Sequence, residues 1–281
     1  MFPWIYDFKW NAGHIIFLSV FFSVLGTVFG SVVTAAFRSA KDLRTRRADA
    51  IRWKGDFEEL PHSARACRHE LAGEVTQRTC DHEFDCRTCA VHPKFLARAA
   101  SAPSPEPALE PAHAAAFGLQ MPADRMYHRG HTWVKPEEDG TFTIGLDDFA
   151  SRLLGSPDAV ELPPPGTNLA ANGTGWHVVT GGARVRILAP LDGVVLEEGG
   201  PDRGWFLRVQ GGGPEIATRH LLRGGEVRPW IMREMERLQF SLAASGTGAT
   251  LADGGELVAD LRREYPDADW DELCVPFFLA G

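Results

Sequence analysis

The sequence predicts three unlike parts: one N-terminal transmembrane helix, a small Cys-rich metal-binding module, and a mainly β domain that ends in C-terminal helices. Three observations predict this fold class. The run from Ile15 to Phe37 contains no charged residue, and four of the five cysteines lie between Cys67 and Cys89. Beyond residue 126, short β-prone runs alternate with glycine, proline and aspartate, which is typical of a small sheet domain.

Composition and charge narrow the class of protein. The chain has 281 residues, a formal net charge of −8 and a pI near 5.7. A broad basic surface for phosphates is therefore not available, and we expect no nucleic acid partner. With 44% hydrophobic and 23% charged residues, the chain is neither disordered nor a multi-pass membrane protein.

The charge-free run predicts a membrane span over residues 14–37, after an extracytoplasmic N-terminus of residues 1–13. A helix of that length rises roughly 35 Å, enough for the hydrocarbon core of a bilayer. The run follows Asp7 and Lys9 and ends in basic residues, unlike a cleaved signal peptide. By the positive-inside rule, the basic residues place the rest of the chain in the cytoplasm, as a single-pass protein of the inner (cytoplasmic) membrane. These residues are Arg38, Lys41, Arg44, Arg46, Arg47, Arg52 and Lys54.

Small residues mark one side of the predicted span. Gly26 and Gly30 form a G-x-x-x-G pattern, and Ser23 and Thr27 occupy a neighbouring strip. Small residues let a second helix approach closely. Besides the lipid bilayer, we therefore expect integral membrane subunits of a complex as partners.

A basic juxtamembrane segment, residues 38–59, leads to the cysteine-rich module, residues 60–97. Four thiolates complete a tetrahedral metal site, and the two-residue gap between the last two suits one ion. His92 is an alternative ligand. The polar surroundings favour zinc over an iron–sulfur cluster, which stays possible, as do free thiols or disulfides. The four are Cys67, Cys80, Cys86 and Cys89, with gaps of twelve, five and two residues.

The remainder divides into a linker and a second domain. Proline alternates with alanine, serine and glutamate in residues 98–125, which is a linker composition. A β domain is expected over residues 126–227, and C-terminal helices with a docking tail over residues 228–281. Pro229 to Leu242 carries apolar residues at helical spacing.

Several short sequence motifs in residues 126–210 resemble the H-protein of the glycine cleavage system, a family of the lipoyl-domain β-sandwich group. The resemblance implies an opening hairpin, a short helix and a last core strand in that order, and hence a lipoyl/H-protein-like sandwich. These motifs are His131-Thr132-Trp133-Val134, Phe142 to Ala150, Leu153-Leu154-Gly155, Val160-Glu161-Leu162-Pro163, Ala189 to Val195 and Gly204 to Val209.

The same resemblance identifies what is missing. The family carries a lipoyl arm on a hairpin lysine, eight residues before the proline of a later turn. Counting back from Pro190 reaches Gly182, and the last lysine of the chain is Lys135. Because the arm needs a primary amine, we expect no lipoate on this domain.

No catalytic motif is evident, and His128, His131 and His177 are better explained as packing residues than as a catalytic group. We therefore expect no enzyme and no small-molecule substrate, but a membrane-anchored accessory or assembly subunit of a bioenergetic membrane complex, with a non-lipoylated H-protein-like interaction module. One alternative is an iron–sulfur electron-transfer subunit that uses the cysteine cluster. Another is a membrane tether that docks lipoyl-using enzymes.

Overall fold

The structure, a computed structural model, describes residues 11–44, 47–101, 116–212, 218–244, 256–266 and 268–279. The chain divides into two compact units, Met1–Ala48 and Asp49–Gly281. The predicted extracytoplasmic residues 1–10 and most of the predicted linker, residues 102–115, lie outside the described residues.

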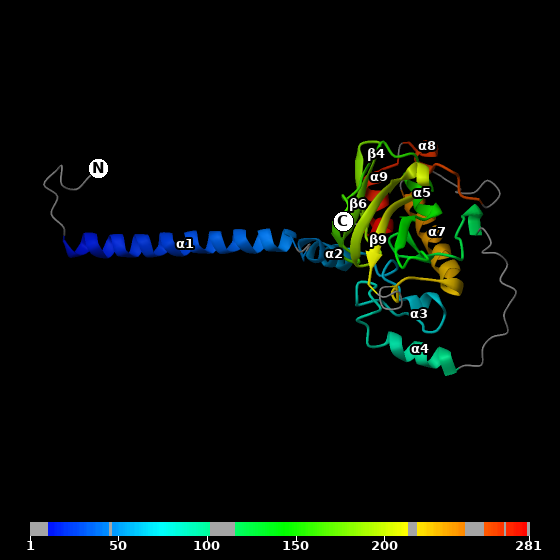
Figure 1. Ribbon diagram of the computed structural model, residues 1–281, viewed down its shortest axis with the longest axis horizontal. Coiled ribbons are helices and arrows are strands. Elements are labelled where there is room, and N and C mark those ends of the chain that lie inside the picture. The colour runs from blue at the N-terminus through cyan, green and yellow to red at the C-terminus, as the bar shows by residue number, and fades with distance from the viewer. Residues whose placement is uncertain are drawn as a thin grey trace. The chain divides into compact units, whose positions relative to one another are not determined.

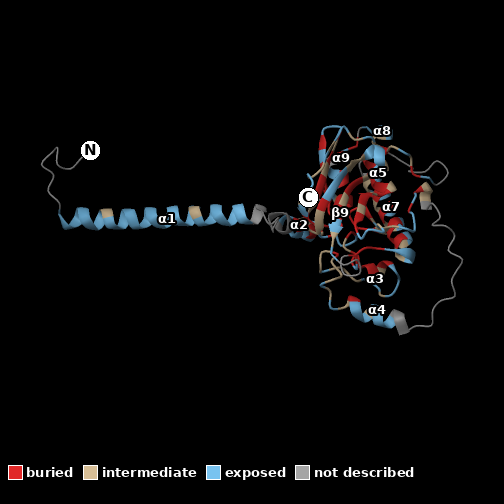
Figure 2. Ribbon diagram, viewed as in Figure 1, coloured by how far each residue is buried: buried red, intermediate tan, exposed pale blue. Residues whose placement is uncertain are grey.

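The first unit contains one long helix, α1 (Ala12–Arg44), which includes the predicted span (Figure 1). Within its stretch Ala12–Lys41, the most apolar 18-residue window has a mean hydropathy of 2.3, and none of that window is buried (Figure 2). Thr27 and Ser31 donate their hydroxyls to the carbonyls of Ser23 and Val28, at 2.8 and 2.7 Å. The polar side chains are thus satisfied inside the helix, which is long and apolar enough to cross a membrane.

Two antiparallel sheets form the β domain of the second unit. One has six strands in the order β1-β2-β3-β9-β8-β5, and the other has three in the order β4-β6-β7. The strands are β1 (Met126–Tyr127), β2 (Thr132–Pro136), β3 (Phe142–Leu146), β4 (Ala159–Glu161), β5 (Asn168–Leu169), β6 (Thr174–Thr180), β7 (Ala183–Leu188), β8 (Gly193–Gly200) and β9 (Trp205–Gly211).

Alternation along the strands explains the core between these sheets. In β6 the side chains of Trp176 and Val178 are buried, whereas the intervening His177 is half-buried. The opening hairpin pairs Val134 with Ile144, and both are fully buried. Helix α5 (Asp148–Leu154) follows it, because Asp147 caps the helix by accepting from the Ala150 amide at 2.8 Å. The hairpin and short helix that the resemblance implies are therefore confirmed.

Helices close one side of the β domain. The short 3-10 helix η4 (Gly224–Glu226) precedes α7 (Val227–Ala244), and α8 (Leu261–Glu264) and α9 (Trp270–Phe278) follow. The apolar residues Phe277, Phe278 and Leu279 of the chain end are at most 2% exposed. Their apolar character is thus accounted for by burial in their own domain, without a partner.

The cysteine-bearing segment packs onto the β domain. It contains α2 (Arg47–Glu59), α3 (Arg68–Leu71) and α4 (His92–Ser101). Trp53 and Phe57 of α2 form a buried cluster with Phe84, Leu188 at the end of β7, and Leu279. The segment therefore shares apolar surface with the domain. Short 3-10 helices η2 (Ala116–Gly118) and η3 (Pro201–Arg203) complete the described elements.

Candidate functional site

The position that the resemblance assigns to the lipoyl lysine lies at the tip of a hairpin. Strands β6 and β7 pair up to Thr180 and Ala183, leaving Gly181 and Gly182 as a two-residue turn. Their φ angles are 51° and 86°, and two successive positive φ values make a type I′ turn, which glycine adopts without strain. The expected hairpin around Gly182 is therefore present.

The turn is held from both sides, yet its tip is open. The Gly181 amide donates to Asp158 Oδ2 at 2.6 Å, and Arg262 Nη2 donates to the Gly181 carbonyl at 3.0 Å. A Cβ atom built on Gly182 would meet nothing within 4 Å. A side chain at position 182 would thus project freely from a fixed turn, but glycine supplies none.

Two facing sheets and a projecting two-residue hairpin define the class of lipoyl-domain-like β domains. Residues 125–199 match the family model described as Glycine cleavage H-protein. The glycine cleavage system H protein of Shewanella woodyi is 36% identical over 102 residues, 32% of this chain and 79% of that protein. The protein of the same description from Neisseria meningitidis serogroup C is 35% identical over 107 residues, 34% of this chain and 84% of that protein.

Among solved structures, a crystal structure of a glycine cleavage system H protein from Mycobacterium marinum matches with 23% identity and a TM-score of 0.35. The match covers 41% of this chain and 99% of that one. On the sequence relatives, the chain belongs to the glycine cleavage H-protein family through its β domain.

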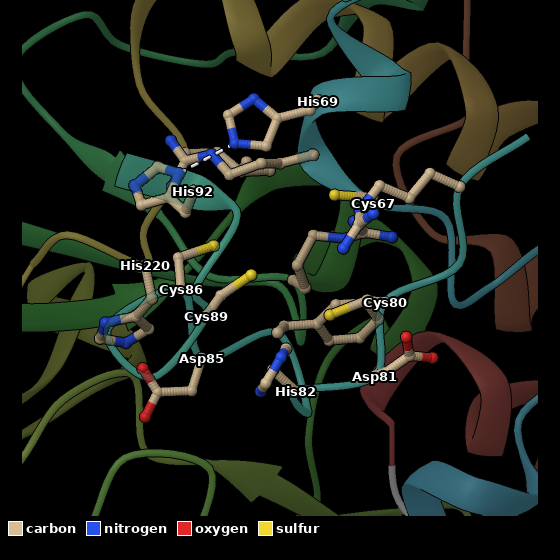
Figure 3. Close-up of a pocket in the computed structure, with 15 residues that line it drawn as sticks. Cys67, His69, Cys80, Asp81, His82, Asp85, Cys86, Cys89, His92 and His220 are labelled. Carbon is tan, nitrogen blue, oxygen red and sulfur yellow. Dashed lines mark hydrogen bonds between the residues drawn. The ribbon is translucent and has the colours of Figure 1, made fainter. Parts of the chain in front are cut away.

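The four clustered cysteines line one pocket of the second unit. Their side chains come from the start of α3, the segment after it, and the loop before α4. In Figure 3 the sulfur atoms of Cys67, Cys80, Cys86 and Cys89 all point from the rim toward the middle of this pocket. All five cysteines of the chain are free thiols, so the disulfide alternative finds no support in the structure. The predicted grouping of four thiols in space is therefore present.

The thiols are not arranged as a formed metal site. Among the described residues, no group of three or more His, Cys, Asp or Glu side chains is placed to hold an ion. Burial raises the pKa of Cys86 to about 11, with Arg68 opposing that rise, and burial also raises the pKa of Cys80. Cys80 and Cys86 are therefore protonated at neutral pH as free thiols, and the metal module stays a proposal.

One buried cation lies beside this thiol pocket, and the buried Glu234 is a charged neighbour of it beyond ion-pair distance. Arg129 is 6% exposed and lines the pocket. It donates to the carbonyls of Ala66 and Ala64 at 3.0 and 3.1 Å, and its guanidinium lies 4.3 Å from the centre of the Phe84 ring. Within the described ranges, no carboxylate lies at ion-pair distance from it. Burial lowers the pKa of Arg129 to about 10, so it still carries its charge at neutral pH.

A second arginine joins the thiol pocket to the far end of the β domain. Arg68 donates to both carboxylate oxygens of Glu226, at 2.9 and 2.5 Å. It also donates to the carbonyls of Arg219 and Leu221, at 2.8 and 3.3 Å. Because the pair is internally neutral, Arg68 acts chiefly as a cross-link between the cysteine segment and the domain.

The alternative ligand His92 is engaged elsewhere. It is 2% exposed, and its Nδ1 lies 2.9 Å from Nε2 of His69, whose ring stacks on Phe95. Burial lowers the pKa of His92 to about 4, so it is neutral. A further histidine, His220, also borders the pocket. Its Nε2 donates to the Pro190 carbonyl at 2.6 Å, while its buried Nδ1 has no partner among the described residues.

The histidines near β2 make hydrogen bonds and ion pairs with different partners. His131 Nδ1 lies 2.9 Å from Asp147 Oδ2, and both are fully buried. His128 donates to Asn172, whose amide nitrogen donates to the Glu83 carbonyl at 3.0 Å. His177 lies on β6, 4.0 Å from Glu161. The three histidines therefore have separate partners, and none of them lines the thiol pocket.

Sequence reasoning missed Arg68, Arg129 and His220. Arg68 and Arg129 belong to no sequence motif, and their hydrogen-bond partners lie 63 or more residues away along the chain. On α1, Cβ atoms on Gly26 and Gly30 would meet nothing within 4 Å, and the predicted packing of this strip on another helix stays a prediction.

Proposed function

We propose that this chain is a membrane-anchored, non-catalytic accessory subunit whose H-protein-like domain serves as an interaction module without lipoate. The observation that carries the proposal is Gly182. The family position for the lipoyl arm is a glycine on a turn that Asp158 and Arg262 hold in place. A domain that keeps the hairpin but has no amine on it retains the surface around the arm and not the carrier chemistry.

The apolar helix α1 supports the membrane part of the proposal. It exposes a continuous apolar surface, such as Phe17, Val24 and Phe29 at 58–70%, which water does not favour. The basic residues after Phe37 would set the N-terminus outside and the domain in the cytoplasm. The strip of Gly26, Gly30, Ser23 and Thr27 would then pack on an integral subunit of a bioenergetic complex.

The lipoate part of the proposal is tested by modification. Full-length protein is incubated with a lipoate ligase, lipoate and ATP, and its intact mass is measured. We expect no lipoyl adduct on the natural chain and an adduct on Gly182→Lys. Gly140→Lys, on the turn between β2 and β3, is the matched control and should stay unmodified. An adduct on the natural chain, for example on Lys135, would overturn this part.

The assembly part is tested in the membrane. The natural chain, extracted in mild detergent at native expression, should migrate in an assembly much larger than itself. Replacing Gly26 and Gly30 by Ile should release it, because two added side chains keep a neighbouring helix away. The control Val28→Ile alters the opposite side of the helix. A monomer for the natural chain would contradict the proposal.

The same extraction separates the proposal from a membrane tether for lipoyl-using enzymes. Purified enzymes that act on lipoylated H-protein are passed over the immobilised chain. Their retention by the natural chain, without any larger membrane assembly, would favour the tether and count against the assembly role.

A further inference from the structure

We propose that Cys67, Cys80, Cys86 and Cys89 bind a single zinc ion as four thiolates, and that Arg129 is the buried counter-charge of that centre. The proposal goes beyond the docking role and does not depend on it. It rests on three features of the thiol pocket: which side chains reach it, how large it is, and which charge borders it.

The four sulfurs reach the pocket from three separate stretches of chain, and all of them point inward (Figure 3). Cysteine has one side-chain torsion, so a rotation about Cα–Cβ moves each sulfur without a change of backbone. Four thiolates at about 2.3 Å from one ion make the closed tetrahedral shell of a structural zinc site. Binding exchanges four thiol protons for the ion, and the protons pass to solvent.

The size of the pocket favours one ion over a cluster. Its interior of about 20 Å³ accommodates roughly one water-sized group. A zinc ion fits that space, whereas a cube of iron and sulfide ions would push the surrounding segments apart. The segment also has little core of its own, and small segments of this kind are commonly held by a metal.

The charge of Arg129 supports four thiolates rather than a histidine-containing set. Zinc with four thiolates carries two negative charges, whereas each histidine that replaces a cysteine removes one. Arg129 is a buried cation whose hydrogen bonds go to backbone carbonyls. Glu234, the acidic group that acts on its charge, lies beyond ion-pair distance and is paired with Arg237. A buried charge without a close counter-charge is costly. Its position beside the thiols supplies positive charge where four thiolates would need it. His92, in turn, already contacts His69.

The test uses full-length protein purified in mild detergent under reducing, oxygen-free conditions. Zinc, iron and acid-labile sulfide are measured on the isolated protein, and Co²⁺ is then titrated into metal-stripped protein. We expect about one zinc per chain without sulfide, and a cobalt spectrum typical of four sulfur ligands. Replacing any one of the four cysteines by Ser should weaken Co²⁺ binding by more than the roughly 10–100-fold typical of a lost outer-shell group. Cys274→Ser, a buried thiol in α9, is the matched control and should bind as the natural chain does.

A separate pair of variants tests the role of Arg129. Arg129→Lys keeps the charge and should bind Co²⁺ with nearly natural affinity, whereas Arg129→Gln should weaken binding about 10–100-fold. Circular dichroism checks that each variant folds. If Arg129→Gln does not fold, a 10–100-fold weakening of Co²⁺ binding by Arg129→Lys, which keeps the charge, would overturn the charge role. A cobalt spectrum with a nitrogen ligand would overturn the four-thiolate set. Iron with sulfide, or no metal uptake by reduced protein, would overturn the zinc site.

Discussion

In the β domain, two antiparallel sheets, in which some neighbouring strands are far apart in the sequence, bury a continuous apolar core. The cysteine-bearing segment contributes Ala66 and Leu71 to that core, and it is also held by a small second apolar cluster and by charged side chains such as Arg68 and Arg129. The comparison indicates that the domain is stabilised by its own core, whereas the segment is ordered by its contacts with the domain.

The largest expected effect on stability comes from a substitution in the core of the β domain. Phe149 is fully buried against His131 and Phe277. Phe149→Ala should lower the free energy of unfolding by about 3–5 kcal/mol, because it opens a cavity. Urea unfolding of the full chain in detergent, followed by tryptophan fluorescence, measures this. Phe240→Ala, on an exposed stretch of α7, is the control and should change little. Equal effects of the two changes would contradict a self-sufficient core.

A pH dependence of stability comes next. Burial would lower the pKa of His131, but Asp147 and Glu234 outweigh it and raise that pKa from 6.5 to about 9. A raised pKa means that the stabilisation is complete below about pH 6.5 and is lost as the pH rises through 9. We expect a loss on the order of 3 kcal/mol over that window. Urea unfolding at pH 6, 7.5 and 9 should show the slope, and His131→Gln should remove it. An unchanged slope in His131→Gln would refute the assignment.

A smaller and more local effect is expected at Arg68. Arg68→Met removes four hydrogen bonds and leaves Glu226 without its partner, at a cost of about 1–3 kcal/mol. Hydrogen exchange should accelerate in the cysteine-bearing segment and not in the sheets. Glu226→Gln combined with Arg68→Met should cost less than the sum of the two changes. Faster exchange in β3 and β9 would show that segment and domain unfold together.

The smallest effect concerns the hairpin tip. Gly182→Ala should cost about 1 kcal/mol, because only its positive φ opposes a side chain. Gly145→Ala should cost more, because its Cβ would lie 2.4 Å from Trp133. The melting temperatures of the two variants measure the difference. A larger shift for Gly182→Ala would mean that the tip contacts other parts of the protein.

Sequence reasoning predicted the elements whose signals are local. The charge-free run was evident from neighbouring residues. The β2–β3 hairpin and the helix after Asp147 were expected from the resemblance to the H-protein family, and the count from Pro190 to Gly182 also rests on that resemblance. The apolar chain end was predicted as a docking tail because periodicity does not tell which surface covers an apolar helix. In the structure its own domain covers it.

The candidate thiol pocket could be predicted only in part. Cysteine spacing brought four thiols together, since ligand spacing is a property of nearby residues. The arginines were not predictable, because the partners of Arg68 lie 151–158 residues further along the chain. No local pattern distinguishes such an arginine from a solvated one.

The separation of Arg68 and Glu226 along the sequence also determines when their contact can form during synthesis. The ribosome adds about 5–20 residues per second, so the 158 residues between them take roughly 8–30 s to make. During that interval the thiols have been synthesised, but the domain that would hold their segment has not. The nascent cysteines are therefore open to the reductants and metal ions of their compartment before folding encloses them.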